Sequence, residues 1–229
     1  MTREPGEAAA LREMAARLPE LERPAVLQGA LWEVPELMAA RGEGQVRFDA
    51  IIGRSALVPR RSTEDQASVL DRQAAARLLT GLLASGGAIS LAEPVPRHAQ
   101  RLYELVDWTP LGKSLAGKVR SAEEAIYDAS DDPWVNWDAD DLRAAFLAAG
   151  LAEVTVETRE TVAETRIAPA VLARWFNPAP EGQRPSYGQH LAALLDPEEL
   201  VRVQGLYERA LSGQTVPWRS VTAFLVARA

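Results

Sequence analysis

Two charged residues follow predicted strands, at the edge where α/β proteins commonly bind ligands. Arg54 follows a strand predicted over 46–52, and Glu93 follows a strand predicted over 88–92. An arginine there could contact a substrate or cofactor, and a carboxylate could orient a nucleophile or act as a base. The alternatives are a solvated loop arginine and an ordinary acidic residue at a helix entry. Glu93 is therefore the candidate catalytic residue.

Basic residues form two further candidate groups. Arg97, His98 and Arg101 lie at the start of a predicted helix, where His98 and Arg101 are three positions apart and can share a face. Arg60 and Arg61 are adjacent in a predicted loop. Both groups could bind phosphate or nucleic acid, and the competing interpretation is a solvated charged surface.

Acidic and aromatic residues form two more clusters. The acidic run lacks the regular alternation of a calcium loop and favours a capped helix start. The aromatic residues could stack nucleic-acid bases or hold loops against the core, and the net charge of -7 favours the core role. The clusters comprise Asp131, Asp132, Asp138, Asp140 and Asp141, and Trp134, Trp137, Trp175, Tyr187 and Trp218.

Composition excludes several classes of protein. The 229 residues include no Cys and two His, which excludes disulfides, thiol catalysis and Cys-ligated zinc and disfavours a histidine metal centre. The net charge argues against a protein that coats duplex DNA. No apolar run reaches about 18 residues and no signal sequence is evident, so we expect no membrane segment and a cytoplasmic location.

Hydrophobic periodicity predicts an α/β fold with a doubly wound, mostly parallel sheet, because helices and strands alternate in the first half. The second half predicts a helix, a long strand, a helical insertion over 168–215 and a terminal strand. The α/β domain would then comprise 1–167 and 216–229. The predicted helices lie at 7–18, 31–40, 62–86, 96–105, 140–149, 169–176, 189–195 and 197–211, and the predicted strands at 24–28, 46–52, 88–92, 151–167 and 218–227.

Three segments in this order resemble the latter part of a class I S-adenosylmethionine-dependent methyltransferase domain. They run from Phe48 to Gly53, from Leu82 to Ala92, and from Ala149 to Val156. The resemblance covers 8–165 and 216–229. It implies that these segments hold the fourth strand, the fifth strand and the turn into the sixth, with an antiparallel seventh strand at the end of the chain. The family's strand order is 3-2-1-4-5-7-6.

The sequence from Leu91 to Tyr103 resembles that of a narrower group of proteins. Together with Arg174-Trp-Phe, Arg184-Pro-Ser-Tyr and Pro217-Trp-Arg-Ser, it is similar to a methyltransferase-like domain fused behind a replication-associated AAA+ ATPase of the recombination-factor type. This resemblance implies an accessory domain that is not catalytic by itself. Its partner would be an upstream ATPase domain of the same polypeptide.

The chain departs from the methyltransferase pattern at the residues that bind the cofactor in that family. It has no G-x-G-x-G loop, and Ala30 of the Gly29-Ala30 pair stands where the family often has an Asp. The resemblance leaves Gly29, Ala30, Gly53 and Arg54 as cofactor-binding candidates and implies that this chain alone binds no S-adenosylmethionine. One alternative is a genuine methyltransferase whose cofactor loop lies upstream of residue 1. Another is a nucleic-acid-binding accessory domain.

The resemblance also predicts an exposed strand edge. In the family's strand order the first and second strands lie between the third and the fourth, and they are missing here. The strand at 46–52 would then have an unpaired apolar edge, which favours association. We expect the strand at 24–28 to pair with this edge, or a second copy of the chain to cover it in a homodimer.

Overall fold

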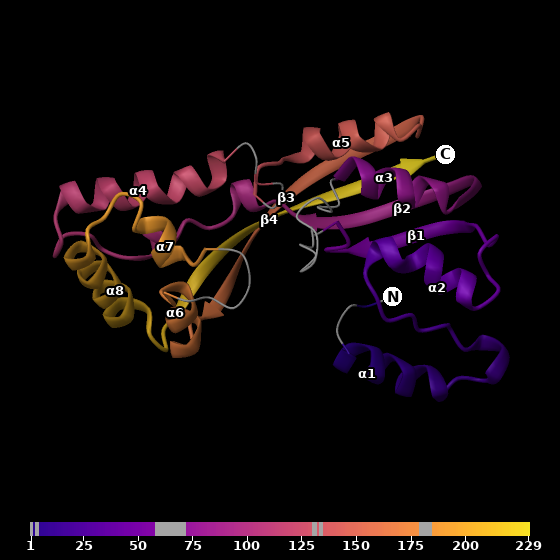
Figure 1. Ribbon diagram of the computed structural model, residues 1–229, viewed down its shortest axis with the longest axis horizontal. Helices are drawn as coiled ribbons and strands as arrows, with labels where there is room; N and C mark the ends of the chain where they lie inside the picture. Colours follow the sequence, from indigo (N-terminus) through magenta and orange to yellow (C-terminus); the bar gives the residue numbers. More distant parts are fainter. Residues whose placement is uncertain (1, 3–4, 58–71, 130–131, 133–134, 179–184) are drawn as a thin grey trace.

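The computed structural model describes the chain except residues 1, 3–4, 58–71, 130–131, 133–134 and 179–184. Four strands form one mixed sheet in the order β1-β2-β4-β3 (Figure 1). β1 and β2 are parallel, whereas β4 is antiparallel to both β2 and β3. This arrangement confirms the α/β prediction and is the order expected for the fourth, fifth, seventh and sixth strands. The strands are β1 (Phe48–Arg54), β2 (Leu83–Pro94), β3 (Glu153–Arg166) and β4 (Thr215–Arg228).

Helices cover one face of this sheet. α3 (Arg72–Gly81) and α5 (Ala139–Ala148) pack their apolar residues against alternate residues of the strands. α5 begins where predicted, because the Asp138 side chain accepts hydrogen bonds from the backbone amides of Asp140 and Asp141. The core on this face includes Ile89, Leu91, Leu142, Phe146 and Leu225.

The opposite face of the sheet is exposed along β1, β2 and β4. Ile52 is 83% exposed and Val226 is 47% exposed, and both lie in register with the exposed Ser90 of β2. Phe224 on the same face of β4 is 41% exposed. A continuous apolar stretch such as 88–92 predicts a strand covered on both faces, and this prediction is wrong for the described part of the chain.

A second hydrophobic core lies around the far end of the long β3–β4 hairpin (Figure 1). Three of its helices come from the predicted insertion, and α8 begins at an N-terminal cap, where the Asp196 side chain accepts a hydrogen bond from the Glu199 amide. The fourth, α4, comes from earlier in the chain, in a stretch where no helix was predicted. The four helices are α4 (Lys113–Asp128), α6 (Pro169–Trp175), α7 (Tyr187–Leu191) and α8 (Pro197–Leu211).

The N-terminal segment lies beyond β1 and forms no strand of the sheet. Residues 24–28 make one isolated bridge, between Gln28 and Thr2, and no described residue of this segment pairs with β1. The expected pairing of 24–28 with the β1 edge is therefore wrong, because Thr2 takes the backbone bonds instead, donating to Leu27 and accepting from Gly29. The helical elements here are α1 (Pro5–Ala16), η1 (Glu20–Glu22), η2 (Leu31–Glu33) and α2 (Val34–Ala40).

Two further predictions about element boundaries are wrong. The helix expected over 96–105 consists of two short 3₁₀ turns, η3 (Pro96–His98) and η4 (Leu102–Leu105). Gln100 interrupts them because its amide nitrogen bonds to the Arg219 carbonyl and its side-chain oxygen accepts from the Arg219 amide. α3 ends at Gly81, and Gly87 lies inside β2, where a Cβ atom would sit 2.9 Å from the Phe48 carbonyl oxygen. No helix among the described residues has the length and hydropathy to cross a membrane.

Candidate functional site

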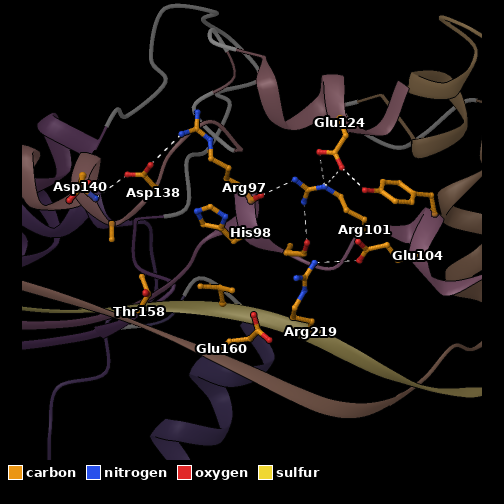
Figure 2. Close-up of a pocket in the computed structure, with 14 residues that line it drawn as sticks. Arg97, His98, Arg101, Glu104, Glu124, Asp138, Asp140, Thr158, Glu160 and Arg219 are labelled. Carbon is orange, nitrogen blue, oxygen red and sulfur yellow. Dashed lines mark hydrogen bonds and ion pairs between the residues drawn. The ribbon is translucent and has the colours of Figure 1, made fainter. Parts of the chain in front are cut away.

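A solvent-open cavity of about 710 Å³ lies beyond the carboxyl end of β2 (Figure 2). This edge of a parallel pair is where α/β proteins commonly bind ligands. η3, the first turn of α5 and the β3–β4 hairpin all contribute to its wall, so residues far apart in sequence meet there. The lining residues are Arg97, His98, Ala99, Arg101, Tyr103, Glu104, Glu124, Asp138, Ala139, Asp140, Thr158, Glu160, Arg219 and Val221.

Arg97, one of the predicted phosphate ligands, is paired with the start of α5. Its guanidinium lies 3.3 Å from the Asp138 carboxylate and also donates to the side-chain oxygen of Asn136. Asp138 is the N-terminal cap of α5, so this ion pair connects η3 to that helix. A phosphate at Arg97 would have to compete with a carboxylate that the fold already places there.

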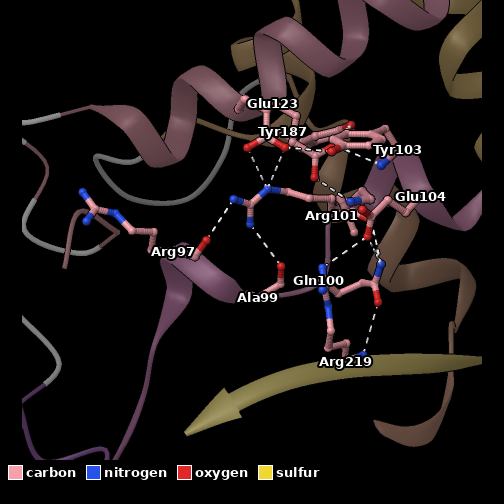
Figure 3. Close-up of polar contacts among 11 residues, drawn as sticks. Arg97, Ala99, Gln100, Arg101, Tyr103, Glu104, Glu123, Tyr187 and Arg219 are labelled. Atoms are coloured by element: carbon pink, nitrogen blue, oxygen red, sulfur yellow. Dashed lines mark hydrogen bonds and ion pairs between the residues drawn. The ribbon is translucent and has the colours of Figure 1, made fainter. Parts of the chain in front are cut away.

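Arg101, the second predicted phosphate ligand, makes hydrogen bonds within the protein through all three of its side-chain nitrogens (Figure 3). Its Nε lies 3.1 Å from both carboxylate oxygens of Glu124, and its other nitrogens donate to the carbonyls of Ala99 and Arg97. Its guanidinium also lies 3.7 Å from the ring centre of Tyr127. All three guanidinium nitrogens bond within the protein, so Arg101 connects η3 to α4, and only its two remaining terminal N–H groups could serve a ligand.

The third arginine of the cavity, Arg219 of β4, lies 3.4 Å from the Glu104 carboxylate. Each of the three cavity arginines is therefore paired with a carboxylate. Asp140 and Glu160 also line the cavity, and no hydrogen bond or ion pair of their carboxylates is seen with the described residues. The exposed His98 also lines the cavity (Figure 2). The charge left without a partner in this cavity is negative.

Glu93, the candidate catalytic residue, does not line the cavity. It is 1% exposed, and its carboxylate accepts hydrogen bonds from the backbone amides of Ala56 at 2.7 Å and Leu57 at 3.2 Å. These two residues follow β1, so Glu93 connects the loop after β1 to the end of β2. The structure supports a positioning role for Glu93, and its predicted catalytic role rests on sequence position alone.

The cofactor-binding candidates lie in two separate parts of the chain, and none of them lines the cavity. Gly53 packs against the core, where a Cβ atom would lie 2.8 Å from Leu91, and Arg54 is exposed at the end of β1. Gly29 packs closely against Glu33, and the fully buried Ala30 donates its amide to the Glu33 carboxylate at 2.5 Å. These contacts are those of a helix entry. Arg60 and Arg61 lie outside the described residues.

A buried acid next to the cavity was not singled out from the sequence. Glu123 of α4 is 1% exposed and accepts hydrogen bonds from the amides of Leu102 and Tyr103 and from the Tyr187 hydroxyl (Figure 3). Burial raises the pKa of the Glu123 carboxyl, although these hydrogen bonds act to lower it. In the sequence, Glu123 is marked only by its position among the apolar residues of α4, and α4 was not among the predicted helices.

No protein-family model matches the chain, and neither does any curated protein. Among solved structures it is similar to a "putative sarcosine dimethylglycine methyltransferase" from Galdieria sulphuraria, at 12% identity and a TM-score of 0.41 over 98% of this chain and 67% of that one. It is also similar to a "putative methyltransferase" from Bacillus halodurans, at 11% identity and a TM-score of 0.43 over 99% and 80% of the two chains. Phosphoethanolamine N-methyltransferase 2 from Haemonchus contortus gives 11% identity and a TM-score of 0.30 over 79% and 33%. Scores this low assign no function, and the strand order of the sheet is the stronger observation.

Proposed function

We propose that the chain is a methyltransferase-like accessory domain of a larger replication or recombination AAA+ ATPase and does not transfer methyl groups by itself. The observation that carries this proposal is the order β1-β2-β4-β3 with β4 antiparallel to its neighbours. This is the second half of the strand order that the resemblance implies. The ATPase association rests on the resemblance of Leu91 to Tyr103 and the tail motifs.

The open face of the sheet supports the view that this half is completed by other protein. Parallel strands such as β1 and β2 are normally covered on both faces, whereas Ile52 of β1 is exposed here, as are Phe224 and Val226 of the adjacent antiparallel β4. α3 connects β1 to β2 and lies on the covered face. The β1–α3–β2 connection moves along the sheet from β1 toward β2. A right-handed connection that moves in the other direction, from β1 to a strand added beyond its free edge, places its helix on the opposite face of the sheet. Strands added beyond β1 would therefore bring helices to the face that is now exposed.

Titration with S-adenosylmethionine tests whether the chain acts alone. We expect no binding heat in isothermal titration calorimetry up to about 1 mM cofactor, because Gly29, Ala30 and Gly53 serve packing and helix entry instead. Binding at micromolar concentration would overturn the proposal and would favour a genuine methyltransferase.

The accessory role requires a second experiment. ATP hydrolysis by the AAA+ portion is measured with and without the purified chain, and we expect the chain to change the rate. Ile52→Lys places a charge on the open face and should abolish this effect, whereas Val201→Lys on α8 is the control. An ATPase rate that is the same with and without the chain would contradict the accessory role.

A further inference from the structure

We propose that the cavity beyond β2 binds a small aliphatic amine through the carboxylates of Asp140 and Glu160. The cavity is formed entirely by residues of this chain. The proposal therefore does not depend on completion of the sheet or on the ATPase, and it can be tested separately from both.

The first argument is the charge that the cavity leaves free. Its three guanidinium groups are neutralised by Asp138, Glu124 and Glu104 at 3.1–3.4 Å. The remaining two carboxylates, Asp140 and Glu160, are exposed and have no such counter-charge among the described residues. These two carboxylates would repel an anionic ligand, which would also have to displace existing ion pairs, whereas they attract a cation and no existing contact has to break.

The second argument is the placement of the two carboxylates on ordered elements. Asp140 lies in the first turn of α5, where its amide donates to the Asp138 side chain at 3.0 Å. Glu160 lies opposite Val221 in the β3–β4 ladder. The two acids therefore reach the cavity from different elements, and His98 of η3 also lines it (Figure 2). Sites on helices and strands hold a ligand more precisely than sites on loops.

The third argument is the type of cation. An ammonium group has only hydrogen-bond donors, and the cavity offers it carboxylates, the Thr158 hydroxyl and an imidazole nitrogen that accepts when neutral. Val221 gives the lining an apolar surface that suits a methylene chain. No group of three or more acidic or histidine side chains in the described residues is arranged to hold a metal ion. These features favour an organic cation over a metal.

Histidine NMR provides a direct test, because the chain has only two histidines, His98 and His190. Protein labelled at the histidine ring carbons is titrated with putrescine in about 150 mM salt, where long-range attraction between exposed charges is screened. We expect the His98 signal to shift in a saturable way and the His190 signal to stay unchanged. Succinate, which has the same chain length and the opposite charge, should shift neither. The His190→Gln variant assigns the two signals.

A pair of double variants identifies the carboxylates responsible. Asp140→Asn/Glu160→Gln removes both free charges of the cavity and should weaken putrescine binding about tenfold or more. Glu164→Gln/Glu198→Gln removes the same amount of charge at exposed positions outside the cavity lining and should leave binding unchanged. The proposal is overturned if putrescine leaves His98 unshifted, if succinate shifts it as much, or if the two double variants bind putrescine equally.

Discussion

The hydroxyl group of Tyr187 donates a 2.7 Å hydrogen bond to the carboxylate of Glu123, which lies 64 residues earlier in the chain. The same carboxylate accepts from the amides of Leu102 and Tyr103 at the start of η4. The Tyr187 hydroxyl also lies 3.1 Å from that of Tyr207 in α8. One buried carboxylate thus connects η4, α4 and α7, and two of these elements, η4 and α4, line the cavity.

Removal of the Tyr187 hydroxyl should destabilise the protein. Tyr187→Phe takes a hydrogen bond from a buried carboxylate, and we expect the free energy of unfolding to fall by about 1.5–3 kcal/mol in urea. Tyr103→Phe is the matched control, because its hydroxyl bonds to the partly exposed Glu124, which water can solvate in its place. The control should lose about 0.5–1.5 kcal/mol. Equal losses in the two variants would contradict a special role for the buried carboxylate.

Glu123 should also make stability depend on pH. Its pKa in the folded protein is raised above the ordinary value of 4.5, chiefly by burial. The folded state therefore holds this proton more tightly than the unfolded state. The stability contributed by the protonated group is complete below 4.5 and is lost as the pH rises through the folded pKa.

Thermal unfolding of Glu123→Gln beside the parent protein checks this sign. From pH 4.5 upward, the melting temperature of the parent should fall relative to that of the variant, because glutamine does not titrate. Other carboxyl groups titrate in both proteins, so their contributions cancel in the difference. A difference that stays constant with pH, or that changes in the opposite direction, would show that Glu123 is not the group responsible.

Glu93 should control the loop after β1. Glu93→Ala leaves the buried amide of Leu57 and the neighbouring amide of Ala56 without this acceptor, and we expect a loss of about 2–4 kcal/mol. Glu93→Gln keeps one acceptor oxygen and should lose less. Hydrogen exchange supplies a local measurement, since these two amides should lose protection first. Unchanged protection of both amides in Glu93→Ala would refute this role.

Sequence patterns predicted the sheet well because its strands carry local signals. The apolar stretches at 46–52 and 88–92 correspond to β1 and β2, and the capped helix from Asp138 was found at its start. The long alternating segment from Leu151 corresponds to β3. These elements depend on residues close together in the chain, so periodicity and capping are sufficient to find them.

The failures depend on contacts between distant residues. Gln100 breaks the expected helix because it bonds to Arg219, more than a hundred positions later. Thr2 takes the backbone bonds of Leu27 and Gly29, and no sequence pattern indicates that pairing. The cavity was found only in part: Arg97, His98 and Arg101 were named together, but their carboxylate partners lie on α4 and α5. Because the arginines are paired with those carboxylates, the predicted anion site is instead a cavity whose unpaired charged groups are acidic.

The exposed sheet face should bind hydrophobic probes. Ile52 is 83% exposed and lies across Ser90 from Val226, so Ile52→Lys replaces an apolar side chain of the open face by a charged one with little cost to packing. We expect the free energy of unfolding to change by less than about 0.5 kcal/mol, while the fluorescence of bound anilinonaphthalene sulfonate falls. Val201→Lys, at a 69% exposed position on α8, should leave the dye signal nearly unchanged. Equal dye binding by the two variants would show that the open face of the sheet is not the main apolar surface of the molecule.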